Sequence, residues 1–243
     1  MVLTPLEEKL KQDCEKIENG MFPNNQNYYD IYDAIKKNLS EKYFENINTA
    51  LAAREGCVFT DHGPKHFFAV ADYASSLVTK DNARFNVTPY EIFLLLTAIL
   101  LHDAANYFGR DNHIKYIAKI VHELGNYPIK DNIEKKVIKK LAEVHSGKIS
   151  VNGVESKDTI GEKISKDIDY YGKISYRPRA IAAVLRFADE ICEDCNRAAR
   201  FLLDDNLINP ECEIFHKYAE SIRSVRVDHE DKSIRIEYNI QER

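Results

Sequence analysis

The feature that most constrains this chain is an unbroken apolar run over residues 92–101. A helix that is apolar on every side has to lie inside the protein, because only a core can bury its whole circumference. Thr88 as N-cap, Pro89 at the first helical position and Glu91 in a capping box predict where this helix begins. We therefore expect a central helix around which the rest of the chain packs.

The end of this run is chemically unusual, because His102 and Asp103 follow the last apolar residue directly. An ionised carboxylate at the edge of a core costs on the order of several kcal/mol unless a cation or hydrogen-bond donors compensate it. A second apolar stretch, residues 180–188, also ends in an acid, Asp189. These acids predict either a bound metal ion or a nearby arginine, and Arg186 could neutralise Asp189 without a metal.

Length and composition fit one domain with a substantial core, because 44% of the 243 residues are hydrophobic. We expect a mainly α fold with a small C-terminal β-hairpin, formed by alternating apolar residues on either side of a polar turn at 228–232. The single domain over 1–243 is divided into an N-terminal helical cover (1–56), a core with the metal site (57–205), and a C-terminal helix and hairpin (206–243).

Other helices are indicated by caps and apolar spacing. We expect helices over residues 4–17 and 27–53, and a helix that begins near Arg177 and continues to about Leu203. Residues 146–175 are polar and lack periodicity, so they are expected to form a long surface loop with one short helix.

The net charge and the distribution of apolar residues restrict where the protein is expected to act and what it is expected to bind. The formal net charge of −5 argues against a general nucleic-acid or anionic-membrane surface, whereas a local pocket for a small anion stays open. The first ten residues lack an apolar run of signal-peptide length, and the central run is too short to span a bilayer. We therefore expect a cytoplasmic protein with no membrane partner.

The five cysteines lack the spacing of a disulfide framework, so reduced thiols are expected. Cys192 and Cys195 form a CxxC motif, but no second pair completes a four-thiolate zinc site. We assign this pair to helix packing in preference to zinc or redox chemistry.

The candidate metal ligands come from separate helical positions and combine two imidazoles with two carboxylates: His66, His102, Asp103 and Asp189. This donor set suits a hard or borderline divalent ion, whereas the absence of thiolate argues against structural zinc. Taken alone, His66 could instead bond a backbone carbonyl, and His145 could simply favour a helix C-terminus. The buried His102-Asp103 pair favours the metal, because its desolvation is otherwise uncompensated.

The order of these residues resembles the HD-domain metal-dependent phosphohydrolases. The resemblance rests on His66, the His102-Asp103 dipeptide and Asp189, and it covers about residues 57–200. The segments 61–63 and 188–197, together with the C-terminal hairpin, resemble a bacterial branch that is often encoded with, or fused to, Hsp90-like ATPases.

The resemblance implies a helical bundle that holds one or two divalent ions, namely Mn, Fe, Zn, Ni, Co or Mg. The first ion would be bound by His66, His102, Asp103 and Asp189. Asp103 would bridge to a second ion, and His113 and His145 fall where its further ligands would lie. The sequence departs from the two-metal pattern at His145, which is followed by serine, and at Ala104-Ala105, where Ile-Gly is common.

The implied activity is hydrolysis of a phosphoester, with a nucleotide or nucleotide-like molecule as the small phosphorylated substrate. The candidate catalytic residues are Asp103, His62, Lys65 and Arg186, the last three to hold the substrate phosphate. Arg177 and Arg179 could reach the same cleft, or they could be solvated charges at a helix start.

The alternative is a catalytically weak or inactive HD-type regulatory module that acts with a partner such as an Hsp90-like ATPase. The C-terminal hairpin and the altered Ala104-Ala105 motivate this alternative. The hairpin could also join two copies of the chain, since two strands alone are marginally stable.

Overall fold

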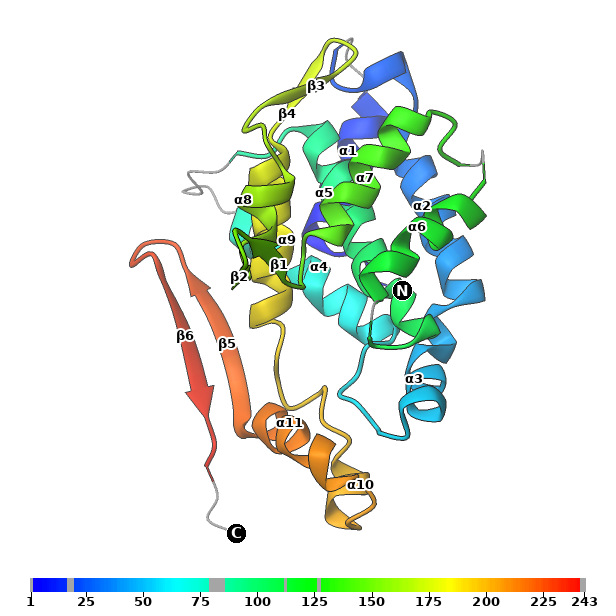
Figure 1. Cartoon of the computed structure of the whole chain (residues 1–243). Coiled ribbons are helices and arrows are strands. Elements are labelled where there is room, and N and C mark those ends of the chain that lie inside the picture. The colour runs from blue at the N-terminus through cyan, green and yellow to red at the C-terminus, as the bar shows by residue number, and fades with distance from the viewer. Residues whose placement is uncertain (1, 17–19, 79–85, 112, 126–127, 241–243) are drawn as a thin grey trace.

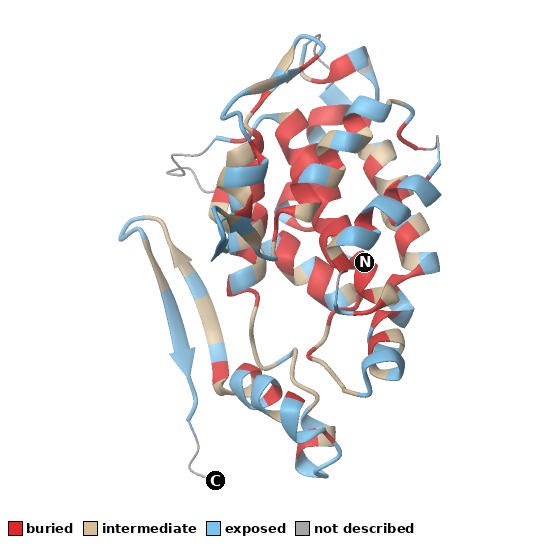
Figure 2. Ribbon diagram, in the orientation of Figure 1, coloured by how far each residue is buried: buried red, intermediate tan, exposed pale blue. Residues whose placement is uncertain are grey.

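The computed structural model describes residues 2–16, 20–78, 86–111, 113–125 and 128–240. The chain is mainly α-helical, and helix α5 (Pro89–His102) runs through the middle of the bundle (Figure 1). Every residue of α5 from Tyr90 to His102 is buried (Figure 2). The predicted capping box is confirmed, because Thr88 and Glu91 each accept the backbone N–H of the other.

Helices from all parts of the chain cover α5. They are α1 (Pro5–Lys16), α2 (Tyr28–Lys42), α4 (Pro64–Val78), α6 (His113–Glu123), α7 (Asn132–Glu143) and α9 (Pro178–Ile191). Short 3₁₀ turns join them: η1 (Pro23–Asn25), η2 (Phe44–Asn46) and η3 (Ala104–Phe108). The predicted mainly α fold is therefore confirmed.

By length and composition the segment Pro89–Phe108 could cross a membrane, which corrects the expectation that this stretch is too short. However, 89% of its apolar window is buried inside the protein. The surrounding helices thus cover the surface that lipid would otherwise contact, as in the core helix of a globular domain.

The helix predicted over 27–53 is interrupted. The backbone of Tyr43 leaves the helical region (φ −127°), η2 follows, and α3 (Ile47–Glu55) begins in a new direction. The break lets Phe44 enter the core, where its ring stacks on Phe67 at 4.1 Å between centroids. The first predicted helix ends at Lys16 in the described part of the chain, and its residue 17 lies outside the described residues.

The expectation of an irregular loop over 146–175 is wrong in part. The short helix is present as α8 (Thr159–Lys163), but two hairpins flank it: β1 (Ile149–Val151) with β2 (Val154–Ser156), and β3 (Asp169–Tyr171) with β4 (Ile174–Tyr176). Asn152 and Gly153 both have positive φ between β1 and β2. Asn-Gly is a strong hairpin signal, because both residues tolerate this conformation.

Helix α9 ends at Ile191, so the prediction that it continues to about Leu203 is wrong. The chain then crosses to two other segments: Asp61 N–H donates to the Arg197 carbonyl, and Cys195 N–H donates to the Ile222 carbonyl. These bonds replace helical ones, and the CxxC motif lies after the helix. The chain becomes helical again in α10 (Arg200–Asp204).

The C-terminal part consists of α11 (Pro210–Ser221) and an antiparallel hairpin of β5 (Ile222–Asp228) and β6 (Ser233–Tyr238), as predicted. The hairpin lies beside the bundle (Figure 1), and His229 near its turn bonds the Ser76 carbonyl of α4 at 2.6 Å. Cys57 and Cys212 form a disulfide with Cα atoms 6.5 Å apart, which differs from the expectation that all thiols are reduced.

Candidate metal centre

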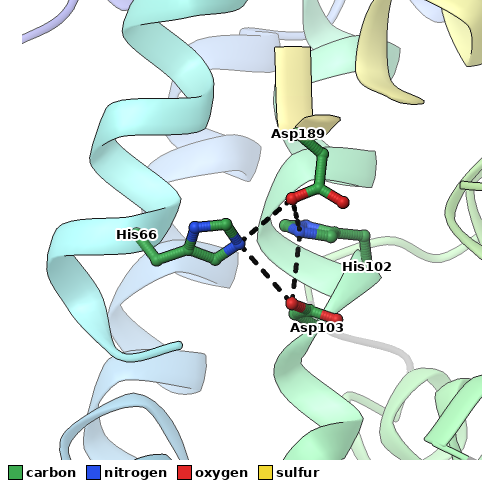
Figure 3. Close-up of side chains that lie close together, drawn as sticks. All are labelled: His66, His102, Asp103 and Asp189. Atoms are coloured by element: carbon green, nitrogen blue, oxygen red, sulfur yellow. Dashed lines mark ion pairs between the residues drawn. The ribbon is translucent and has the colours of Figure 1, made fainter. Parts of the chain in front are cut away.

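Three helices deliver the four candidate ligands to one point. His66 lies in the first turn of α4, His102 ends α5 with Asp103 as its C-cap residue, and Asp189 lies in the last turn of α9. Figure 3 shows the two imidazoles and the two carboxylates pointing toward one another. The sequence prediction that these residues are neighbours is thus matched by the fold.

The spacing of these atoms suits a shared ion better than direct hydrogen bonds. The Nε2 atom of His66 lies 3.3 Å from Asp189 Oδ1 and 3.5 Å from Asp103 Oδ2, and that of His102 lies 3.6 and 3.7 Å from the same oxygens. All four atoms lie within 4.8 Å of one another. Tetrahedral ligands at ~2.1 Å from an ion are about 3.4 Å apart.

Two nitrogens of this group have no hydrogen-bond partner. Nε2 of His66 and Nε2 of His102 are both buried and unpartnered within the described part of the chain. Nδ1 of His102 lies 2.6 Å from the Ile99 carbonyl, which assigns the ring proton to Nδ1 and leaves the Nε2 lone pair facing the carboxylates. A buried lone pair aimed at two acids is the arrangement that a divalent cation completes.

Electrostatics keep both acids ionised. Burial alone would raise the pKa of Asp103 and of Asp189, but the positive charge that the neighbouring imidazoles carry when protonated, with His102 foremost, holds both well below the usual range. Burial and the charge of Arg197 lower the pKa of His66. The attraction of the two carboxylates, at distances that are long for hydrogen bonds, outweighs this and raises that pKa well above its usual value. A metal ion and a proton therefore compete for His66.

A second group of ligands shares Asp103. Nε2 of His113 and Nε2 of His145 each lie 3.6 Å from Asp103 Oδ1 and 3.4 Å from each other. Their Nδ1 atoms lie 2.9 Å from the Arg110 carbonyl and 2.6 Å from the Ala142 carbonyl, so both Nε2 lone pairs face the acid. The fold places both histidines at Asp103, as the resemblance implies, and their binding of a second ion stays a prediction.

His62 borders the first group. Its Nε2 lies 3.8 Å from Asp103 Oδ2, and its Nδ1 lies 2.5 Å from the Thr60 carbonyl. The loop is held by Asn48, whose side chain donates to Asp61 Oδ1 and accepts the backbone N–H of His62. Burial lowers the pKa of His62 well below its usual value, so the ring is neutral with its proton on Nδ1.

The two other predicted phosphate-binding residues do not join this group. Lys65 is exposed on the first turn of α4. The Arg186 guanidinium donates to the Lys157 carbonyl and to Thr159 Oγ1, so it anchors the start of α8. Among the described residues Arg186 forms no ion pair with Asp189, and the metal-free explanation for that acid therefore lacks support.

The arginines at the start of α9 also bind elsewhere. Arg177 forms two hydrogen bonds to the Glu91 carboxylate at the opposite end of α5. Arg179 donates to the Ile164 carbonyl and to Asp167. Arg177 thus joins the start of α9 to α5, and Arg179 joins it to the 146–175 region.

Two arginines that the sequence did not single out as phosphate-binding residues lie at His62. Arg110 Nη1 lies 2.7 Å from His62 Nε2, and Arg197 Nη2 lies 3.5 Å from the same atom. Arg197 belongs to the segment that carries the family resemblance. Arg110 has no local signal, because only the fold brings residue 110 to the loop before α4.

A hollow of about 730 Å³ lies apart from this centre, between α6 and α7. Its lining includes His122 and three lysines, Lys135, Lys136 and Lys139, but no carboxylate among the described residues. It therefore lacks the mixed donor set of a metal site, and the candidate metal centre is the one at Asp103.

Comparison with known families agrees with this geometry. A family model, HD-CE, matches residues 57–242, which include every candidate ligand. The chain belongs to the HD-CE family. No curated protein and no solved structure matches the chain. The match supports the HD-type domain predicted from the sequence, and the link to Hsp90-like ATPases stays a prediction.

Proposed function

We propose that this HD-CE protein is a metal-dependent phosphohydrolase or phosphodiesterase that acts on a nucleotide or nucleotide-like phosphoester. The observation that carries the proposal is the pair of buried, unpartnered Nε2 atoms of His66 and His102 facing two ionised carboxylates. Imidazole nitrogen with carboxylate oxygen is the donor set of catalytic divalent ions, among which Mn, Fe, Zn, Ni, Co and Mg fit.

His66, His102, Asp103 and Asp189 would hold the first ion, and Asp103 with His113 and His145 would hold a second. A bound divalent ion supplies two things to phosphoester hydrolysis, a lowered pKa of water and withdrawal of charge from a phosphoryl oxygen.

The residues of this chain supply orientation and access. The Asp189 side chain is 23% exposed, whereas the other three are at most 6% exposed, so substrate and water reach the centre past Asp189. The backbone carbonyls that bond Nδ1 of His102 and His145 fix both rings, which keeps their Nε2 atoms aimed at the two oxygens of Asp103. Neutral His62 borders the centre, and its Nε2 accepts a hydrogen bond from Arg110.

The test combines metal content with activity. Purified protein should contain about one or more divalent ions per chain by element analysis, and it should hydrolyse a member of a panel of mono-, di- and cyclic nucleotides with Mn or Mg. His102→Ala together with Asp103→Ala should remove both the ion and the activity. His122→Ala, on the exposed face of α6, is the matched control. Full hydrolysis by the double variant would refute the proposal.

A regulatory module is the second candidate, and the surface of the C-terminal part favours it. Large apolar side chains are exposed on α10, α11, the hairpin and the residues that adjoin them: Phe201, Leu207, Ile214, Phe215, Tyr218, Ile236, Tyr238 and Ile240. Exposed apolar surface of this kind is typical of protein interaction sites. A metal-loaded protein that leaves the whole panel intact, and that forms dimers lost in Phe215→Asp, would favour this candidate over the enzyme.

A further inference from the structure

We propose that Arg110 and Arg197 form an anion subsite at the edge of the metal centre, where they bind the non-bridging oxygens of the substrate's reacting phosphoryl group. The inference rests on the proposed function, because it names the residues that recognise the phosphate at that same centre. These two arginines replace Lys65 and Arg186, which the sequence favoured for this role.

Both guanidinium groups converge on one atom. Arg110 Nη1 and Arg197 Nη2 lie 2.7 and 3.5 Å from His62 Nε2. A neutral imidazole whose proton is on Nδ1 offers one lone pair on Nε2, so it accepts one good hydrogen bond. The Arg110 bond uses that lone pair, and the Arg197 contact is long. Two cations that share one acceptor leave hydrogen-bond donors available to an anion.

Arg197 is the fixed member of the pair. Its Nε donates to the Asp61 carbonyl at 3.0 Å, and its Nη1 donates to the Cys192 carbonyl and to Glu193 Oε2. The side chain is only 11% exposed. These bonds hold the guanidinium plane in place, and Nη2 is the donor that is turned toward His62.

Arg110 is the adjustable member. It is exposed, and among the described residues its guanidinium forms one hydrogen bond, to His62, and no ion pair. Its backbone is anchored, because its N–H donates to Glu55 and its carbonyl accepts from His113 Nδ1. The backbone of Arg110 is thus tied to His113 of the second metal-binding group, whereas its guanidinium can turn toward a bound anion.

The position of the two arginines beside the metal centre, together with their positive charge, favours a phosphate as the bound anion. His62 Nε2, on which both arginines converge, lies 3.8 Å from Asp103 Oδ2, so the subsite adjoins the centre. Glu193 compensates Arg197 at 2.7 Å, whereas the charge of Arg110 has no acidic partner among the described residues. A guanidinium presents paired donors that match two oxygens of one phosphoryl group.

The experiment measures binding apart from turnover. Inorganic phosphate is titrated into metal-loaded protein by calorimetry, and the metal content of each variant is measured by element analysis. We expect Arg110→Ala to weaken phosphate binding by roughly 10- to 100-fold with unchanged metal content, and Arg110→Lys to restore part of the loss. Arg54→Ala, which removes an exposed arginine bonded to the Tyr107 carbonyl, should bind as the wild type does.

Arg197 needs a milder change, because it joins the loop at Asp61 to the segment that follows α9. Arg197→Lys should weaken phosphate binding while thermal unfolding shows that the protein remains folded. If hydrolysis is measurable, Arg110→Ala should raise KM more than it lowers kcat.

The outcomes separate this inference from the proposed function. Phosphate binding that depends on Arg110 in a protein that hydrolyses nothing supports the subsite and refutes the enzyme. Wild-type hydrolysis combined with an unchanged phosphate affinity in Arg110→Ala refutes the subsite and leaves the enzyme standing. A wild-type protein that carries metal but binds no phosphate also refutes the subsite.

Discussion

The two ends of α5 each bury an acid, and they treat it in opposite ways. At the N-terminal end, Glu91 accepts from Thr88 N–H and from the backbone, Nε and Nη2 of Arg177, all at 2.6–2.9 Å. At the C-terminal end, five imidazole nitrogens surround Asp103, but each lies 3.5–3.8 Å away. Hydrogen bonds to a carboxylate are shorter than that, at about 2.7–2.9 Å.

The difference separates an acid that the protein satisfies from an acid in a candidate metal centre. Glu91 is satisfied by the protein's own cation, and the bonds join the start of α5 to the start of α9. Asp103 is surrounded by groups spaced too widely to satisfy it, and two of the neighbouring nitrogens, Nε2 of His66 and of His102, have no hydrogen-bond partner among the residues that the structure describes. The protein therefore completes one end of the helix by itself, whereas the groups at the other end are arranged so that they could hold a cation.

The largest effect is expected from Asp103→Asn. It keeps the size of the side chain but removes the charge, so metal content should fall to a small fraction and hydrolysis should fall by at least about 10²- to 10³-fold. Glu91→Gln is the matched change at the other end and should keep the metal content of the wild type. Element analysis measures the metal content of both variants. Equal metal loss in the two would contradict the difference that we infer between Asp103 and Glu91.

Removing the ion should destabilise only a protein that binds it. With free metal at a hundred times Kd, binding contributes about 2.7 kcal/mol to the free energy of unfolding, which a chelator should remove. Wild type and Arg177→Met should lose the same amount in thermal or urea unfolding, and Asp103→Asn should lose none. A chelator response in Asp103→Asn would place the ion somewhere else.

Removing the ion pair between Arg177 and Glu91 at the N-terminal end of α5 should lower the free energy of unfolding but leave the activity unchanged. Arg177→Met leaves Glu91 buried without its cation, and because Arg177 is 33% exposed we expect a loss of about 2 kcal/mol, below the range for a fully buried pair. Urea unfolding measures the loss. Activity per folded molecule should match the wild type, and a selective loss of turnover would show that the two ends are coupled.

The smallest effect is a change in acid sensitivity. Burial would raise the pKa of Glu91, but Arg177 and the Thr88 N–H outweigh it and lower the pKa below its usual 4.5. Because the folded-state pKa is depressed, this carboxylate stabilises the fold above pH 4.5, and the contribution disappears as the pH falls through the folded value. Metal-free Glu91→Gln should therefore lose less stability than metal-free wild type between neutral and acidic pH, and parallel curves would contradict this.

Much of the centre could be predicted because its signals are local. The buried run with its capping box specified α5, and acids at the ends of two apolar helices indicated a shared cation. The pairing of Arg177 with Glu91 could not be predicted in the same way, because 86 residues separate them. Cys57 and Cys212 are 155 residues apart and meet only once α11 has packed beneath the loop that carries Cys57.

The fold predictions failed where tertiary contacts override local pattern. Apolar spacing continued past Ile191, but the chain leaves α9 there to bond the loop at Asp61 and the start of β5. That departure also brings Arg197 to His62. Arg186 illustrates the reverse case. It is close to Asp189 in sequence, but its guanidinium bonds the start of α8, whereas Arg110 and Arg197 from other segments lie at His62.

Asp103 turns one oxygen toward His66 and His102 and the other toward His113 and His145. A single negative charge thus serves two positions, and the first cation to arrive would take up part of the attraction that the second needs. Loading would be stepwise with unequal affinities, so the free metal concentration around the protein would set whether it works with one ion or with two.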